Sequence, residues 1–190
     1  MTALGSQLLA VWEIAAWQGK AAGRGWSRLD LSNAAFWTSY LGLLVAFFIQ
    51  VPLHSYEGGF AQDNQSAGFE LLQLLSSNIL EYATFALMVW IVCRVWAGNF
   101  DKMKKIIICV NWIIPVLYII QYILTAIYYS YGSDRTIIYY IVMVLAAFVL
   151  LGFIVTMVRI FREAMNTNWL IAFVCSAISF SVSTIAGGLF

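Results

Sequence analysis

One apolar stretch of the sequence is long enough to span a membrane and carries a carboxylate, Glu81, near its middle. Five polar residues of this stretch are three or four positions apart and share one helical face, with Asn78 at its edge: Glu70, Gln73, Ser77, Glu81 and Thr84. Glu81 is roughly 20 Å along the helix from Arg94, so its side chain cannot reach water by snorkelling. A carboxylate at this depth can exchange a proton, bind a cation or hold helices together by hydrogen bonds.

A second apolar stretch carries polar and aromatic residues at the same depth. Its polar face, spaced by three and four residues, contains Asn111, Pro115, Tyr118, Tyr122, Thr125 and Tyr129. Because the two helices run in opposite directions, we expect Tyr118, Gln121 and Tyr122 to be the partners of Glu81. The expected intramembrane polar site is Glu81, Asn78, Ser77, Tyr118, Gln121 and Tyr122. Pro115 lacks an N–H and is expected to kink its helix near Asn111 and to free a backbone carbonyl.

The composition predicts an integral membrane protein. Of the 190 residues, 63% are hydrophobic and 10% are charged, far from the composition of soluble domains. Five stretches are long and apolar enough to cross a bilayer: 34–53, 71–95, 106–128, 137–158 and 169–190. We therefore expect an all-α, polytopic fold of five transmembrane helices preceded by an N-terminal interfacial amphipathic helix.

The basic residues predict the orientation of these spans. Nine of the ten lysines and arginines lie in the N-terminal segment, the second connection and the fourth connection. Only Arg135 lies on the other side, with the acidic loop around Glu57 and Asp63. By the positive-inside rule the N-terminus is expected in the cytoplasm and the C-terminus on the opposite side.

The sequence divides into a cytoplasmic interfacial segment, residues 1–33, and a transmembrane domain, residues 34–190. Residues 1–20 can form a helix whose apolar arc, including Leu4, Leu8, Val11 and Trp12, faces the membrane or other protein. Trp12, Trp17 and Trp26 are the expected membrane-interface anchors. Two glycines are expected to break this helix after residue 20, and Ser32 or Asn33 to cap the first span.

The fifth span carries small residues along one side, at Ser176, Ser179, Ser183 and Gly187. Such a ridge lets another helix approach closely. The approaching helix can belong to this chain or to a partner, and the pattern does not decide between them.

The sequence contains no recognisable catalytic or metal-binding motif. His54 is the only histidine, and Cys93, Cys109 and Cys175 form no C-x-x-C pair. A formal charge of +1 gives no basic bias toward nucleic acid. We expect a protein that is not an enzyme, has no cofactor other than bound lipids, and contacts membrane lipids and either other membrane subunits or copies of itself.

Two segments resemble those of a known family. The segment "RLDLSNAAFWTSYLGLL" enters the first span, and "CRVWAGNFDKMKKIIICVNWIIPVL" joins the second span to the third. With five spans, these resemble the Yip1-like membrane proteins and, more narrowly, small bacterial inner-membrane proteins. The resemblance implies a five-helix fold, a role in a membrane complex or in trafficking, and a bacterial inner membrane as the location. It brings no catalytic residues, and the long polar N-terminal region of eukaryotic relatives is missing here.

Three functions follow as hypotheses. The first is an accessory or scaffold subunit of a larger membrane complex, with the interfacial helix and the small-residue ridge as its outward faces. The second is a small proton or cation carrier or channel subunit that uses Glu81 in an oligomer. The third is a lipid-binding protein with an aromatic-rich groove.

Overall fold

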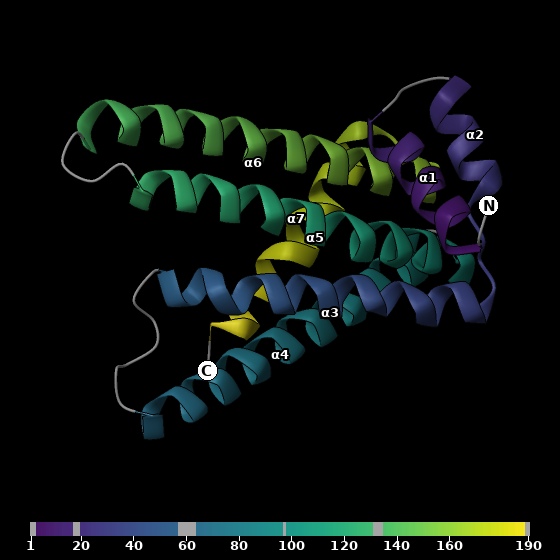
Figure 1. Cartoon of the computed structure of the whole chain (residues 1–190). Helices are drawn as coiled ribbons and strands as arrows, with labels where there is room; N and C mark the ends of the chain where they lie inside the picture. The colour runs from purple at the N-terminus through teal and green to yellow at the C-terminus, as the bar shows by residue number, and fades with distance from the viewer. Residues whose placement is uncertain (1–2, 17–19, 57–63, 97, 131–134, 189–190) are drawn as a thin grey trace.

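The described part of the chain is entirely helical (Figure 1). The computed structural model describes residues 3–16, 20–56, 64–96, 98–130 and 135–188. Within these residues there are seven helices: α1 (Ala3–Ala16), α2 (Lys20–Arg28), α3 (Asn33–Tyr56), α4 (Asn64–Trp96), α5 (Phe100–Ser130), α6 (Arg135–Met165) and α7 (Trp169–Gly187).

Five of these helices confirm the expected membrane spans. The apolar segments long enough to cross a bilayer are Asn33–Pro52, Gly68–Trp96, Phe100–Ser130, Ile137–Met165 and Trp169–Gly187. The chain is therefore an integral membrane protein with five candidate spans, preceded by the shorter apolar helix α1. At one end of the bundle lie α1, α2 and the connections after α4 and α6 (Figure 1). This end carries nine of the ten lysines and arginines, and we call it the basic end.

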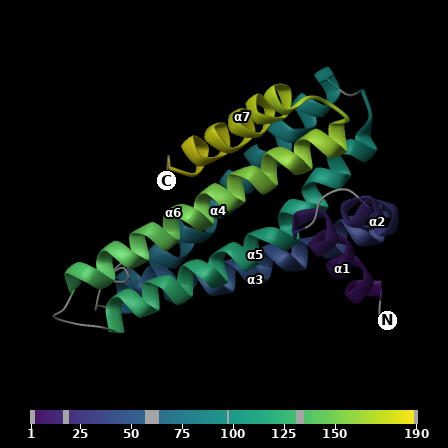
Figure 2. The same cartoon turned by 90° about the horizontal axis from the view of Figure 1, so that it is seen from above.

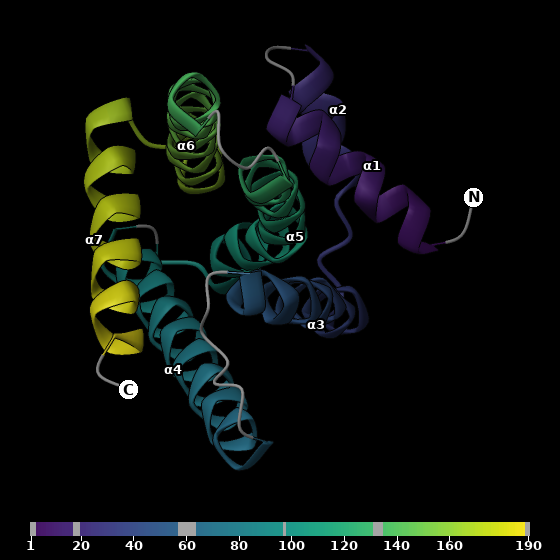
Figure 3. The same ribbon diagram turned by 60° about the vertical axis from the view of Figure 1, so that its left-hand side comes forward.

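The spans pack in pairs that differ from their order along the chain. Helix α3 lies along α5, and α4 lies along α7, while α6 packs against both α5 and α7. Helix α4 crosses α3 obliquely and touches it little, although the two are consecutive (Figures 1 and 2). In Figure 3, α7 covers the side of α4 that faces away from α3.

Polar residues define several helix ends. Ser32 accepts a hydrogen bond from the backbone N–H of Ala35 at 3.1 Å, which makes it the cap of α3 and decides between the two expected caps. Asn168 caps α7 by accepting from the N–H of Ile171 at 2.8 Å. Asn166 ends α6 with a φ of 55°, a left-handed conformation that asparagine tolerates.

The N-terminal segment forms two helices, and Gly23 and Gly25 do not break a helix as expected. The first helix ends at Ala16, and Gly23 and Gly25 lie inside α2. A Cβ atom on Gly25 would lie 2.7 Å from the carbonyl oxygen of Ala10 and 3.0 Å from the backbone N of Ile14. Gly25 therefore serves the close packing of α2 on α1, a tertiary role that helix propensity does not reveal.

An alanine at Gly25 should loosen the α1–α2 pair, whereas one at Gly23 should not. The Cβ on Gly25 meets backbone atoms of α1, so the helices must separate, at an expected cost of about 1–2 kcal/mol. Gly23 is the matched control, since no atom lies within 4 Å of its Cβ position. Gly23→Ala should leave stability unchanged or raise it by up to about 1 kcal/mol. Hydrogen–deuterium exchange of Ala3–Arg28 measures both variants, and equal exchange in the two would contradict this packing.

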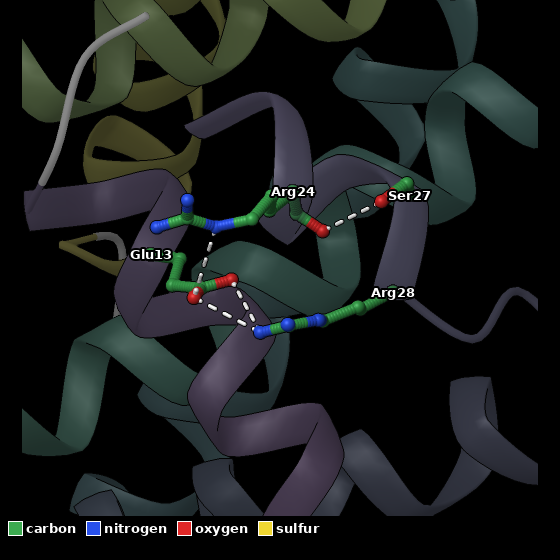
Figure 4. Close-up of polar contacts among 4 residues, drawn as sticks. All are labelled: Glu13, Arg24, Ser27 and Arg28. Carbon is green, nitrogen blue, oxygen red and sulfur yellow. Dashed lines mark hydrogen bonds and ion pairs between the residues drawn. The ribbon is translucent and has the colours of Figure 1, made fainter. Parts of the chain in front are cut away.

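An ion-pair cluster on the surface also joins α1 to α2 (Figure 4). Arg28 donates to both carboxylate oxygens of Glu13, at 3.0 and 3.2 Å, and the Nε of Arg24 lies 3.9 Å from Glu13 Oε1. Both arginines are exposed, so water and salt screen these pairs and each contributes little to stability. Gln7 adds a reciprocal pair of hydrogen bonds with the backbone of Asp30, at 3.0 and 3.1 Å.

Candidate functional site

A groove of about 510 Å³ lies between α3 and α4, where these two helices cross and separate. Helices α5 and α7 also contribute to its wall, through Ile114, Tyr118, Phe180 and Ser183. Most of its lining is apolar, and it is rich in aromatic side chains: Tyr40, Phe47, Tyr82, Phe85, Tyr118 and Phe180. The size is typical of sites that hold a drug-sized molecule.

Glu81 lies on the wall of this groove, near the middle of the α4 span, and its polar contacts are with α7. The hydroxyl of Thr184 donates to Glu81 Oε1 at 3.3 Å. One turn earlier on α4, the hydroxyl of Ser77 donates to the carbonyl of Gly187 at 2.7 Å. A Cβ on Gly187 would lie 3.0 Å from Glu81 Cβ, so this glycine lets the end of α7 pack directly on the carboxylate side chain.

The structure brings together only some of the residues expected around Glu81. Asn78 and Tyr118 line the same groove, and Ser77 binds α7 beside it. Gln121 lines a different cavity, of about 440 Å³, between α5 and α6. Tyr122 is half-buried on α5 and does not line the groove. The hydrogen-bond partner of Glu81 is Thr184, because α4 packs along α7 rather than along the polar face of α5.

A buried hydrogen-bond chain crosses three helices beside the groove. The hydroxyl of Tyr82 donates to Asn111 Oδ1 at 2.8 Å, and Asn111 Nδ2 donates to the hydroxyl of Ser39 at 2.8 Å. Ser39 in turn donates to the carbonyl of Phe36 at 2.7 Å. Asn111 and Ser39 are fully buried. This hydrogen-bond chain holds α4, α5 and α3 together at one level of the bundle, because a buried polar group without a partner would destabilise the fold.

Sequence reasoning placed Asn111 on the polar face of its span but missed Tyr82 and Ser39 as its partners. The available signal was a lone asparagine inside an apolar helix, which requires polar partners on neighbouring spans. A search for hydroxyl residues at matching depth on the other spans would have included Ser39 and Tyr82.

Pro115 frees the backbone carbonyl of Asn111, and α3 packs against that carbonyl. Helix α5 continues through Pro115 from Phe100 to Ser130, and the proline is buried. A Cβ on Gly42 would lie 2.1 Å from the Asn111 carbonyl oxygen. The hydrogen that glycine carries in that direction therefore points at the oxygen, in the manner of a Cα–H···O contact. A glycine backbone, rather than a side chain, occupies the space beside the freed carbonyl.

The small-residue ridge of α7 packs inside the chain. Ser176, Ser179, Ser183 and Gly187 are all buried within the bundle. Gly187 contacts α4, and Ser183 lines the groove. As a result, the ridge of this chain is not available to another subunit.

Charged and polar groups join the N-terminal helices to α6 at the basic end. Arg159, which is 6% exposed, pairs with Glu163 at 3.3 Å and donates to the carbonyl of Ile14. Trp26 is half-buried and donates through its Nε1 to Glu163, so its indole N–H has a partner within the protein. Trp12 remains 57% exposed on α1, and Trp17 lies outside the described residues.

The N-terminal helix packs on protein with a face that shares Val11 with the expected apolar arc. Its buried side chains are Gln7, Ala10, Val11 and Ile14. Leu4, Leu8 and Trp12 are exposed. Helix α1 thus packs on protein with one face and presents a second apolar face outward.

Comparison of the chain with protein-family models, with curated proteins and with solved structures finds no match. Among the side chains that the structure describes, no group of three His, Cys, Asp or Glu residues could hold a metal ion. The groove with Glu81 on its wall is therefore the feature on which a function can be argued. Its apolar walls and its few polar groups suit an amphiphilic molecule that reaches the site from the bilayer.

Proposed function

We propose that this chain is a non-enzymatic membrane protein that binds a hydrophobic, membrane-dissolved molecule in the groove between α3 and α4. The observation that carries the proposal is a groove of about 510 Å³ at mid-span whose apolar and aromatic wall includes a carboxylate. A groove that only accommodated lipid chains would gain nothing from Glu81, since an intramembrane carboxylate is costly to keep.

The helix packing supports this choice among the functions expected from the sequence. Because α3 packs on α5 and α4 packs on α7, the side chains of α3 and α4 do not close the groove between these two helices. The burial of the α7 ridge removes one of the two surfaces on which a role as accessory or scaffold subunit was argued. The roles as accessory subunit and as proton or cation carrier stay predictions.

The proposed setting is a bacterial inner membrane, with the basic end in the cytoplasm and the C-terminus on the other side. The gathering of nine basic residues at one end of the bundle supports this orientation.

Photolabelling in nanodiscs tests for a binding site. The probe is a tetradecanol that carries a diazirine in its chain, added to the purified full-length protein in phosphatidylcholine nanodiscs. We expect labelling of groove residues such as Leu44 and Ile79 that saturates and that excess unlabelled tetradecanol displaces. Labelling of lipid-facing residues of α6, such as Phe148, should rise linearly with probe concentration.

A pair of alanine-to-tryptophan variants gives the control. Ala83 is exposed and lines the groove, so Ala83→Trp should fill it and abolish the saturable labelling. Ala147 is exposed on α6 and lines neither cavity, so Ala147→Trp should leave the labelling intact. Groove labelling that stays linear and cannot be displaced in the unchanged protein would refute the proposal.

A further inference from the structure

The described lining of the groove contains a carboxylate but no cationic side chain. Among the described residues that line it, none is lysine, arginine or histidine. Nine of the ten lysines and arginines are at the basic end. An ionised Glu81 near mid-span would therefore lack a compensating charge, because the hydrogen bond from Thr184 is donated by a neutral hydroxyl.

The second polar group on the groove wall of α4 also offers an acceptor. Asn78 lies one turn before Glu81, and its amide nitrogen donates to the carbonyl of Leu74 at 2.8 Å. Its amide oxygen can accept a hydrogen bond from a ligand, and its second N–H can donate one. Two acceptors one turn apart on the same helical face favour a ligand that donates hydrogen bonds.

The aromatic side chains of the groove also favour a positive charge. Tyr40 and Tyr82 pack edge to face, with ring centroids 5.6 Å apart, and Tyr118 lines the same groove from α5. The faces of tyrosine rings attract cations, and the attraction is stronger where water is excluded. The Tyr82 hydroxyl already donates to Asn111, so it does not offer a donor to a ligand.

We propose that the molecule bound in the groove is a lipophilic ammonium ion, in which a hydrocarbon or aromatic body carries one protonated amine. Glu81 neutralises the ammonium group, Asn78 accepts a second N–H, and the body lies among apolar side chains such as Leu43, Leu44 and Ile79. A phosphate or carboxylate head would place like charge against Glu81 and is excluded from the site. The inference rests on the proposed binding function and names the chemistry of its ligand.

Competition against the photolabel tests the charge preference. The displacing compounds share one chain length and differ only in the head group: tetradecylamine, tetradecanol and tetradecanoate. In phosphatidylcholine nanodiscs, tetradecylamine should displace the label at a concentration about tenfold or more below that of tetradecanol, because the ammonium group compensates the charge of Glu81 and the hydroxyl group does not. Tetradecanoate should be the weakest of the three.

Two glutamate variants separate the site from general charge effects. Glu81→Gln should remove the advantage of tetradecylamine over tetradecanol, and saturable labelling that tetradecanol still displaces shows that the variant is folded. Glu70→Gln makes the same charge change on α4 outside the groove and should preserve the preference.

The outcomes distinguish the two proposals. Saturable labelling without preference for the amine, or a preference that survives Glu81→Gln, overturns the assignment of an ammonium ligand while leaving a binding groove. An absence of saturable labelling in the unchanged protein refutes the binding function itself.

Discussion

Replacing Gly42 with alanine should separate α3 from α5 and strongly destabilise the protein. The added Cβ would lie 2.1 Å from the carbonyl oxygen of Asn111 and 3.0 Å from its carbonyl carbon. Both are backbone atoms of α5, so no side-chain rotation relieves the overlap and the helix axes must move apart. Overpacking typically costs about 1–3 kcal/mol, and we expect Gly42→Ala to reach or exceed about 3 kcal/mol.

The displacement should reach the Tyr82–Asn111–Ser39 hydrogen-bond chain as well. Ser39 lies about one turn before Gly42 on α3, so a shift of α3 stretches its hydrogen bond with Asn111, which is now 2.8 Å long. Thermal unfolding in mild detergent measures the loss of stability. Gly152→Ala in α6 is the matched control, since nothing lies within 4 Å of its Cβ position and its melting temperature should not fall. Equal melting temperatures for the two variants would contradict the close approach of Gly42 to the Asn111 carbonyl.

The spans could be predicted from the sequence because a bilayer imposes a length and a composition on each helix. The stretch 137–158, for example, contains no charged residue, and its spanning character does not depend on what packs against it. Ser32 could likewise be offered as a cap, because capping is a local interaction between a side chain and the next turn.

The partners of Glu81 could not be predicted in the same way, because they depend on which spans are neighbours. Depth alone put Tyr118, Gln121 and Tyr122 level with the carboxylate, yet Thr184 binds it. Within a bilayer every span has an apolar surface, so hydropathy does not select among packing arrangements. The pairing of α4 with α7 follows instead from small residues such as Gly187 and from shape.

Two glycines of α2 show the same limit of prediction from sequence, for a contact between neighbouring helices. Gly23 and Gly25 are two residues apart in α2, and from the sequence both favour a break in the helix. Only the position of α1 distinguishes them: Gly25 faces the backbone of Ala10, and Gly23 faces open space. A glycine required by a tertiary contact and one that is merely tolerated look alike in a single sequence.

Replacing Arg159 with methionine should release the N-terminal helix pair from the bundle. Arg159 donates to the carbonyl of Ile14 in the last turn of α1, where backbone carbonyls lack partners within the helix. Its positive charge also lies at the negative end of the α1 dipole. Methionine retains much of the length of the side chain but provides neither the hydrogen bond nor the charge.

The loss should be large because the arginine is buried and its partner remains. Removing one member of a buried pair typically costs about 3–5 kcal/mol, since the other charge is left without compensation. Glu163 is one-fifth exposed and keeps Arg162, 3.6 Å away, and the donor Trp26. We therefore expect Arg159→Met to cost about 2–4 kcal/mol, below the full range for an isolated buried charge.

Hydrogen–deuterium exchange locates this effect, because the arginine connects α6 to α1 rather than one span to another. Amides of Ala3–Arg28 should exchange faster in Arg159→Met, while those of Ile106–Asn111, which lie in the buried centre of α5, should keep their protection. Arg28→Met is the control, as it removes an exposed partner of Glu13 and should change stability by no more than about 1 kcal/mol. Because Arg28 joins α1 only to α2, a comparable loosening in both variants would mean that the segment is held by its surface ion pairs instead. Loosening confined to Arg159→Met would make the buried guanidinium the group that fixes the N-terminal helices to α6.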